Sequence, residues 1–123
     1  MDNDPWGNVW EKAIQEKSFH FAVRTVKLCK YLQSEHKEYI LSKQLMRSGT
    51  SIGANVAEAQ QAQSKPDFIN KMNIALKEAY ETVYWLRLIY ATEYLQKNAF
   101  ESVMEDCEEL VKLLTAIVKS ARE

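Results

Sequence analysis

Glycine and proline are scarce in this chain of 123 residues, which holds three of the first and two of the second. A β-sheet protein needs a turn every several residues, and such turns are rich in these two residue types. Their scarcity therefore predicts an all-α fold. Long apolar runs are also absent, since none approaches the roughly 18 residues of a membrane-spanning helix. We expect no membrane contact.

A dominant charge of either sign is missing as well. Sixteen Lys and Arg residues oppose seventeen Asp and Glu residues, which leaves a net charge of −1. No global attraction to nucleic acid or to an anionic membrane follows from this balance. The chain begins MDNDPWGNVW, which is acidic and lacks the apolar region of a signal peptide. Cys29 and Cys107 fall on apolar helix faces and are predicted to be buried thiols of a cytoplasmic protein.

Apolar residues recur with helical spacing in four segments separated by short polar connections. The helices are predicted at about 8–34, 39–63, 65–96 and 98–121. Start signals support this division: Asn8 precedes Glu11, Ser64 precedes Pro66, and Asn98 precedes Glu101. Short connections favour antiparallel neighbours. Residues 1–123 are therefore expected to form one domain, an up-down-up-down four-helix bundle.

The first and third segments are apolar over a wider arc than one core interface requires. In the first, the apolar set covers roughly 200° of the helix wheel, against a stripe of about 100° for a surface helix. That set is Phe19, Phe21, Ala22, Val23, Val26, Leu28, Cys29 and Leu32. The fourth segment is a one-sided surface helix by comparison. The wide arcs predict a second buried interface, made with another copy of the chain.

Known catalytic patterns of helical bundles are not found. A di-iron site needs Glu-x-x-His, but the residues three before His20 and His36 are Lys17 and Gln33. The cysteines lack partners at zinc-ligand spacing, and the glycines are too few for a phosphate-binding loop. A Ser-His-Asp arrangement has no flanking signature here. We expect no enzymatic activity and no cofactor or metal.

Residues 44–62 carry only two charged side chains, Arg47 and Glu58. A surface helix would carry more charges opposite its apolar stripe, so we expect a central helix that is covered on most sides and lies close to its neighbours.

One stripe of this second segment looks like a binding site. Arg47, Ser51, Asn55 and Glu58 lie at spacings that stack side chains on one helix face. A ligand site is one interpretation. The favoured interpretation is a buried or interfacial polar network, in which Arg47 pairs with Glu78 or Glu81 and Glu58 pairs with Lys71.

A basic stripe on the first segment offers a different function. Lys17, His20, Arg24 and Lys27 align on one face, and nucleic-acid binding uses such stripes to neutralise phosphates. A solvated helix face is an equally compatible interpretation. The tentative nucleic-acid contacts are therefore Lys17, Arg24 and Lys27.

The second and third segments carry a distinctive order of polar residues. The first part reads Gln44-Leu45-x-Arg47-Ser48-x-x-Ser51-Ile52-x-x-Asn55-x-x-Glu58, and Asp67-Phe68, Ile74-Ala75-x-x-Glu78-Ala79-x-Glu81-Thr82 and Trp85-Leu86 follow it. This order resembles the four-helix-bundle proteins encoded in 23S rRNA intervening sequences. The resemblance extends from about residue 19 to residue 118. It implies a cytoplasmic homopentamer without an established biochemical activity.

A related branch, the accessory protein of diversity-generating retroelements, is also similar in fold. The resemblance to that branch implies a pentamer that binds nucleic acid and works with a reverse transcriptase. That branch is strongly basic, whereas this chain is not. We therefore expect a homo-oligomeric scaffold or assembly factor for a protein or ribonucleoprotein partner. The alternative is an accessory protein that binds RNA or DNA, or a reverse-transcriptase-like partner, through the basic stripe.

Overall fold

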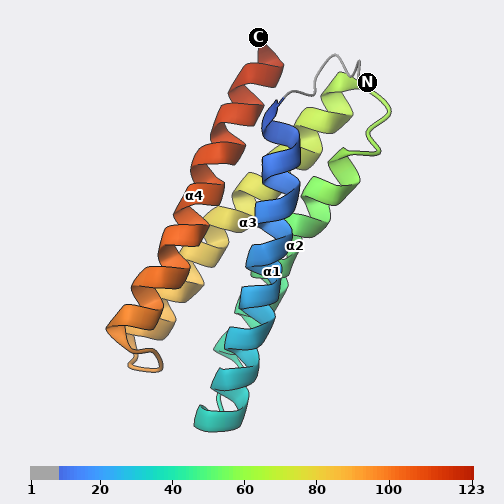
Figure 1. Cartoon of the computed structure of the whole chain (residues 1–123). Helices are drawn as coiled ribbons and strands as arrows, with labels where there is room; N and C mark the ends of the chain where they lie inside the picture. The colour runs from blue at the N-terminus through green and yellow to red at the C-terminus, as the bar shows by residue number, and fades with distance from the viewer. Residues whose placement is uncertain (1–8) are drawn as a thin grey trace.

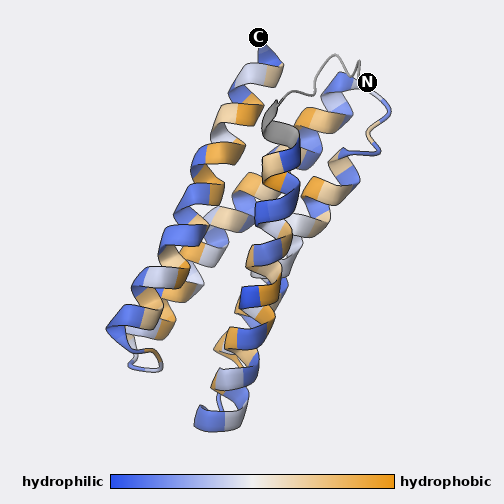
Figure 2. Ribbon diagram, in the orientation of Figure 1, coloured by the Kyte–Doolittle hydropathy of each residue, from blue (hydrophilic) through white to orange (hydrophobic). Residues whose placement is uncertain are grey.

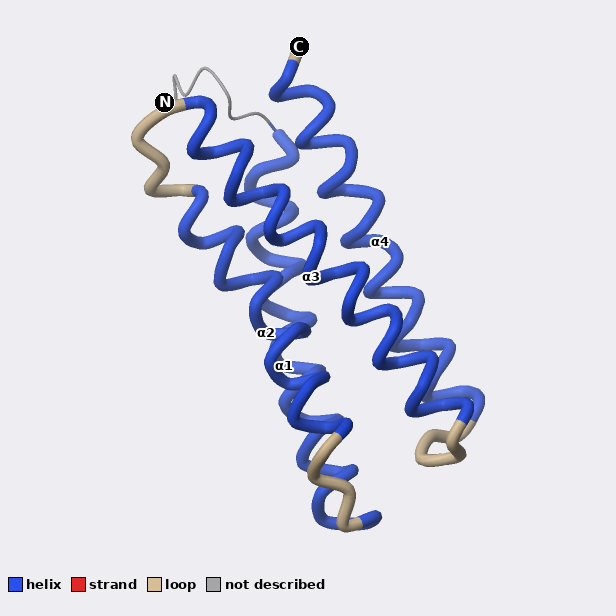
Figure 3. The backbone as a smooth tube through the Cα atoms, turned by 180° about the vertical axis from the view of Figure 1, so that it is seen from behind, coloured by secondary structure: helices blue, strands red, loops and turns tan. Residues whose placement is uncertain are grey.

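The computed structural model describes the backbone of residues 9–123 and the side chains of residues 12–123, and within this range it contains helices and connections but no strand. Its helices are α1 (Val9–His36), α2 (Leu41–Ala59), α3 (Lys65–Ala91) and α4 (Lys97–Arg122). Figure 1 and Figure 3 show them from opposite sides. The all-α four-helix prediction is confirmed.

Consecutive helices run antiparallel, so that the chain passes up and down the bundle (Figure 1). The α1–α2 and α3–α4 connections lie at one end, and the α2–α3 connection lies at the other. Each helix packs against its two neighbours in a ring, and α1 and α4, which close that ring, make the least contact. The α1–α2 side and the α3–α4 side are therefore opposite faces of the molecule.

The core lies along the inward stripes of all four helices, and Figure 2 shows the alternation of apolar and polar residues along each of them. Helix α4 fits its one-sided pattern, because its apolar stripe is buried and its acidic residues Glu101, Glu105 and Glu108 are exposed. The largest fully buried side chains are Phe21, Phe68, Ile14, Leu32, Leu45, Ile52, Met72, Leu86, Ile89, Leu110, Leu114 and Val56.

Small residues let α1 and α2 approach closely. A Cβ atom added to Gly49 would lie 2.6 Å from the Thr25 Oγ1 atom, and one added to Gly53 would lie 3.2 Å from the Ser18 carbonyl oxygen. The glycines are needed here because the neighbouring helix occupies the space that a side chain would fill. The expectation that this segment lies close to its neighbours is met on its α1 side.

Helix α2 is less covered than the sequence suggested. Its buried face faces α1 and α3, whereas Arg47, Ala54, Ala57 and Glu58 are exposed. The helix also ends at Ala59 rather than at residue 63, because residues 60–62 turn into the α2–α3 connection. Within a single chain, the prediction of a central helix covered on most sides was wrong.

Helix α3 ends at Ala91, five residues before its predicted end. Glu93 takes a left-handed conformation with φ of 71°, and the Tyr94 N–H donates to the Ile89 carbonyl at 3.1 Å. This is a helix stop of the kind that glycine usually signals, made here without glycine. The remaining differences in helix length are one or two residues.

The predicted start signals had mixed outcomes. The Ser64 hydroxyl accepts a hydrogen bond from the Asp67 N–H at 3.2 Å, as its cap role requires. The Asn98 cap was wrong, because α4 starts after Gln96 and no side chain caps it. The Asn8 signal lies outside the described residues.

The start of α2 carries a cap that the sequence did not reveal. Glu38 is buried, and its carboxylate accepts hydrogen bonds from the N–H groups of Ile40, Leu41 and Ser42 at 3.1, 2.9 and 2.7 Å. Burial alone would raise the pKa of Glu38, but these donors and the Ser42 hydroxyl outweigh it and lower the pKa below its ordinary value. Glu38 precedes the helix by three residues, so no standard cap position identifies it.

Candidate functional site

The polar stripe of α2 lies along its seam with α3. The Arg47 guanidinium donates to Glu78 at 3.2 Å and also to Glu81, whose carboxylate accepts a further hydrogen bond from the Trp85 indole at 3.1 Å. The Trp85 donor and the Arg47 guanidinium lower the pKa of Glu81, and the hydrogen bond to Glu81 raises that of Arg47. The structure thus brings Arg47, Glu78 and Glu81 together.

The rest of the stripe does not join this cluster. Glu58 pairs with Lys71 on α3 at 3.0 Å. Ser51 and Asn55 instead bond within α2, the first to the Arg47 carbonyl at 2.6 Å and the second to the Ser51 carbonyl at 2.9 Å. The stripe therefore consists of two separate groups of ion pairs, one at Arg47 and one at Glu58. Between them, Ser51 and Asn55 form hydrogen bonds to the backbone of their own helix.

The exposure of the charged side chains limits how much the polar stripe can stabilise a single chain. The side chains of Arg47 and Glu58 are 48% and 59% exposed, so the network is not buried. Exposed ion pairs of this kind contribute at most about 1 kcal/mol each. The sequence analysis proposed a polar network that is either buried or located at an interface. In a single chain the network is not buried, so an interface with another molecule is the remaining alternative.

A buried polar pair that the sequence analysis did not predict lies deeper in the same seam. The hydroxyl oxygens of Ser48 and Thr82 are 2.9 Å apart, and the Thr82 hydroxyl donates to the Glu78 carbonyl at 2.7 Å. Both residues are fully buried. Both residues belong to the polar order that carries the family resemblance, and Ser48 also sits between the apolar residues Leu45 and Ile52 on the inward face.

The basic stripe of α1 faces the acidic side of α4. Lys17 pairs with Glu109 at 3.2 Å, and Arg24 pairs with Asp106 at 2.7 Å. Arg24 also donates to the Ser102 carbonyl at 3.3 Å. The stripe is thus partly neutralised across the α1–α4 seam, and of the three tentative contacts Lys27 alone makes no ion pair with a described residue.

An apolar groove runs along the outer side of the α1–α2 pair. It has a volume of about 450 Å³ and is lined mainly by Phe19, Ala22, Gly53, Ala54 and Ala57. Phe19 stands at its edge with 71% of its side chain exposed. We call this surface the α1–α2 groove. It includes Phe19 and Ala22 from the wide apolar arc recognised in the sequence.

A ridge of aromatic side chains lies on α3. Tyr80 and Tyr84 are one helical turn apart, and the two residues are 57% and 56% exposed. Beside Tyr84, a hollow of about 500 Å³ lies between α3 and α4, with Leu88 and Phe100 in its wall. We call Tyr80 and Tyr84 the tyrosine ridge. The two apolar surfaces differ in composition, since small residues predominate in the groove, whereas the ridge presents two exposed tyrosines.

The two cysteines behave as structural residues. Both are buried and unpaired, the Cys29 thiol donating to the Ser42 carbonyl at 3.2 Å and the Cys107 thiol to the Ala79 carbonyl at 3.6 Å. Burial, with a smaller contribution from nearby carboxylates, raises the pKa of each thiol to about 12. Neither thiol is a nucleophile at neutral pH.

No group of three or more His, Cys, Asp and Glu side chains among the described residues is arranged to hold a metal ion. No helix found between residues 9 and 122 has the length and apolarity needed to cross a membrane.

Comparison with known proteins places these features in context. Residues 9–116 match the model of a family described as 23S rRNA-intervening sequence protein. A crystal structure of a protein of unknown function from the S23 ribosomal protein family of Bacteroides thetaiotaomicron is 55% identical, with a TM-score of 0.89. The similarity covers 90% of this chain and 99% of that one. No curated protein matches the chain.

Proposed function

The chain belongs to the 23S rRNA-intervening sequence protein family, and from this premise we propose that it is a non-enzymatic, homo-oligomeric scaffold. Its oligomer is a pentamer that presents a protein or ribonucleoprotein partner with a repeated surface. The observation that carries this proposal is the pair of apolar surfaces, the α1–α2 groove and the tyrosine ridge, that a single chain leaves exposed.

The two surfaces suit a contact between unlike faces. The α2 side of the groove carries Gly53, Ala54 and Ala57, with Phe19 of α1 at its edge, while the ridge presents two tyrosine rings. A groove with small residues on one wall has room for exposed tyrosine rings, so it complements the ridge better than it complements a copy of itself. Because they lie on different helix pairs, a contact between them is heterologous, and heterologous contacts close into rings when the rotation allows.

Tyrosine is well suited to such a contact. It is enriched in the centres of protein interfaces because its ring buries a large area at little cost in conformational entropy. A contiguous exposed apolar patch on a soluble protein commonly marks an interaction site. These arguments support assembly through the groove and the ridge and identify no bound substrate.

The basic stripe supports the alternative function less well. A nucleic-acid accessory protein that used Lys17, Arg24 and Lys27 would need to break the Lys17–Glu109 and Arg24–Asp106 pairs or to bind beside them. Each phosphate contact would then release less electrostatic free energy than one made by an unpaired side chain. The scaffold is therefore the function that the geometry supports best.

Light scattering on two variants and their mixture tests the proposal. Ala54→Arg fills the groove, and Tyr84→Asp places a charge on the ridge; both positions are exposed, so the bundle should stay folded. We expect wild type to be pentameric and each variant to be monomeric. Lys112→Asp, at an exposed position of α4 outside both surfaces, should remain pentameric.

The mixture distinguishes a heterologous contact from a symmetric one. Ala54→Arg keeps an intact ridge and Tyr84→Asp keeps an intact groove, so the two variants should form a dimer through one intact contact. A wild-type protein that stays monomeric at micromolar concentration would overturn the scaffold proposal. A mixture that stays monomeric would overturn this choice of surfaces.

A further inference from the structure

The connection between α1 and α2 ends in an isoleucine that the fold hardly uses. Ile40 occupies the N-cap position of α2, and the residue is 77% exposed. Isoleucine is among the poorest N-cap residues, because its side chain cannot accept a hydrogen bond from the first N–H groups of a helix. No side-chain cap hydrogen bond is made at this position. Ile40 therefore contributes little to the core and nothing to helix capping.

Glu38 caps the helix instead and holds the turn in place. Its carboxylate accepts hydrogen bonds from the N–H groups of residues 40–42, and its own N–H donates to the Leu32 carbonyl at 3.1 Å. The turn so fixed presents Tyr39, which is 57% exposed, next to Ile40. Apolar groups that are already held in place lose little conformational freedom when they bind a partner. We call Tyr39 and Ile40 the Tyr39–Ile40 turn.

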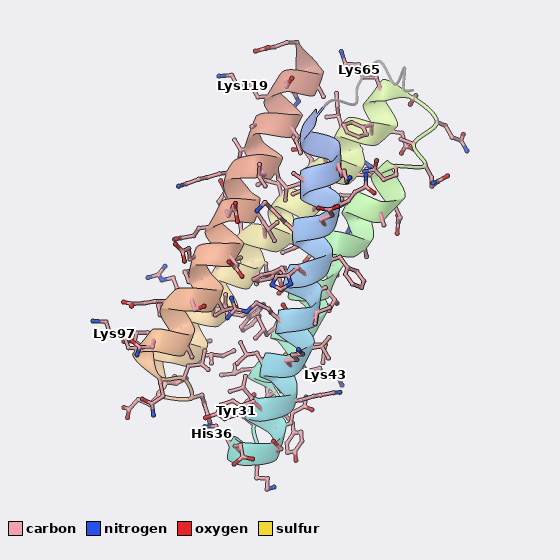
Figure 4. All side chains as sticks on the ribbon, viewed as in Figure 1. Tyr31, His36, Lys43, Lys65, Lys97 and Lys119 are labelled. Atoms are coloured by element: carbon pink, nitrogen blue, oxygen red, sulfur yellow. The ribbon has the colours of Figure 1, made fainter. Side chains whose placement is uncertain are left out.

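Ile40 shares its helix face with a basic residue. Its backbone angles are helical, with φ of −90° and ψ of −57°, so the residues three and four positions later lie on the same face. These residues are Lys43 and Gln44, and both are exposed. Lys43 makes no ion pair with another described residue. Figure 4 shows Lys43 at this end of the bundle, with Lys65 and Lys119 at the other end.

The chain around the Tyr39–Ile40 turn presents more free positive charge than negative charge. Three basic residues, Lys37, Lys43 and Arg47, are near it in sequence, against the carboxylates of Glu35 and Glu38. Arg47 is paired with two glutamates of α3, and the buried Glu38 carboxylate is bonded to the α2 backbone. Two lysines without an ion pair to a described residue therefore remain beside one exposed carboxylate. This balance favours an acidic partner.

The Tyr39–Ile40 turn is separate from the surfaces assigned to the ring. Neither of its residues lines the α1–α2 groove, and the tyrosine ridge lies on α3. Along α2, Ile40 lies about 15 Å from Thr50, the first residue of that helix in the groove wall. A ring closed through the groove and the ridge would leave one such turn accessible on each copy of the chain.

We propose that the Tyr39–Ile40 turn anchors a partner protein through an amphipathic helix with acidic flanks. The Ile40 side chain packs into the hole between four apolar residues of that helix, as a knob does in helix–helix packing. Carboxylates beside the apolar stripe of the partner helix pair with Lys43 and Lys37. Tyr39 extends the apolar contact, and tyrosine is frequent among the residues that dominate binding energy.

The inference rests on the scaffold function, because it describes the partner that the scaffold would hold. The contact itself needs only one copy of the chain. Ala54→Arg protein, which is expected to be monomeric, should therefore bind the partner helix with the same affinity per chain as the ring does. Loss of the ring and loss of the partner contact are separate experimental outcomes.

Fluorescence anisotropy with labelled peptides of about 18 residues, or five helical turns, tests the inference on the full chain. One probe is an amphipathic helix of leucine and glutamate. The others carry lysine in place of glutamate or serine in place of leucine. We expect the leucine–glutamate peptide to bind and both others to bind at least about tenfold more weakly. An unlabelled single-stranded RNA should compete poorly.

Variants of Ile40 separate binding from structure. Ile40→Leu keeps a large apolar side chain and should bind the leucine–glutamate peptide as wild type does, whereas Ile40→Ser should lose about tenfold in affinity. Serine is a better N-cap residue than isoleucine, so Ile40→Ser should keep or raise the midpoint of urea denaturation. A structural role of Ile40 would lower that midpoint.

A charge variant tests the acidic flanks. Lys43→Glu should weaken binding of the leucine–glutamate peptide by at least about threefold and strengthen binding of the leucine–lysine peptide. Lys112→Glu, at an exposed position of α4, makes the same change of charge away from the Tyr39–Ile40 turn and should alter neither affinity. Equal effects of the two variants would show a general dependence on net charge and would overturn the inference.

The two proposals fail in different ways. A pentamer that does not bind the leucine–glutamate peptide at about 1 mM overturns the partner contact and leaves the scaffold standing. Equal affinity for the acidic and basic peptides, unchanged binding by Ile40→Ser, a loss of stability in that variant, or displacement of the peptide by RNA also overturns the partner contact. A wild-type monomer that binds the peptide through Ile40 overturns the ring alone.

Discussion

Helix α1 joins its two neighbours by different chemistry. On the α2 side, Gly49 and Gly53 let the backbones approach until no room for a Cβ atom remains at Gly49. On the α4 side, contact is sparse and the seam is spanned by Lys17–Glu109 and Arg24–Asp106. The first seam depends on shape and the second on charge. They should therefore respond differently to substitution, salt and pH.

The largest expected effect is at the glycine of the α1–α2 seam. At an unobstructed helix position, glycine to alanine would stabilise the protein by about 1 kcal/mol. In Gly49→Ala, however, the new methyl would meet Thr25 Oγ1 at 2.6 Å and Cγ2 at 2.7 Å. We expect a net loss of about 1–3 kcal/mol in the free energy of unfolding, measured by urea denaturation.

A double-mutant cycle makes that prediction specific. Thr25→Ala removes the two closest atoms, so it should restore part of the stability lost in Gly49→Ala. Gly53→Ala serves as a milder comparison, because its Cβ would lie 3.2 Å from the Ser18 carbonyl oxygen. A Gly49→Ala variant more stable than wild type would show that the two helices can separate freely.

The next effect concerns the turn at the end of the same seam. Glu38→Ala removes the acceptor for three N–H groups of α2 and should cost about 1–2 kcal/mol. Because folding lowers the pKa of Glu38, its contribution is present above the ordinary carboxyl pKa and is lost as the pH falls through the lower, folded-state pKa. Urea denaturation from pH 7 to pH 3 should show this acid-dependent loss.

A neighbouring carboxylate provides the control for Glu38. Glu35 is exposed on the last turn of α1, and Glu35→Ala should leave the acid-dependent loss unchanged, whereas Glu38→Ala should reduce it. If both variants titrate like wild type, the carboxylate cap does not stabilise the folded chain.

The smallest effect is expected at the charged α1–α4 seam. The side chains of Arg24 and Asp106 are 32% and 35% exposed, so their ion pair is partly screened by water. A double-mutant cycle with Arg24→Ala and Asp106→Ala should give a coupling of about 0.2–1 kcal/mol. The coupling should fall in 1 M salt, whereas the Gly49 effect should not. If the Arg24–Asp106 coupling energy were as large as the stability lost in Gly49→Ala, the two seams would not differ in the way described above.

Much of the fold followed from local patterns. Helical periodicity gave four helices, and the Ser64–Pro66–Asp67 signal placed the start of α3 correctly. The ends of α2 and α3 were harder to predict, because Glu93 adopts a left-handed stop without the glycine that usually marks one. The Asn98 signal failed because α4 begins before it and uses no side-chain cap.

The candidate site divides in the same way. Helical spacing put Arg47 and Glu58 on one face, and it left Glu78, Glu81 and Lys71 as their partners across the seam. Their degree of burial could not be read from spacing, because it depends on how far apart the helix axes lie. Ser51 and Asn55 looked like members of the network, but short polar side chains can bond to the backbone one turn earlier in their own helix.

The sequence by itself determined the helices, their inward stripes and the family, because periodicity and residue order are local properties of the chain. Only the tertiary structure decided which charges are neutralised. Lys17 and Arg24 became partners of α4 residues more than 80 positions away, whereas Lys30, Lys37 and Lys43, near the α1–α2 connection, make no ion pair with another described residue. Electrostatic pairing depends on distance in space, and that distance exists only once the bundle has closed.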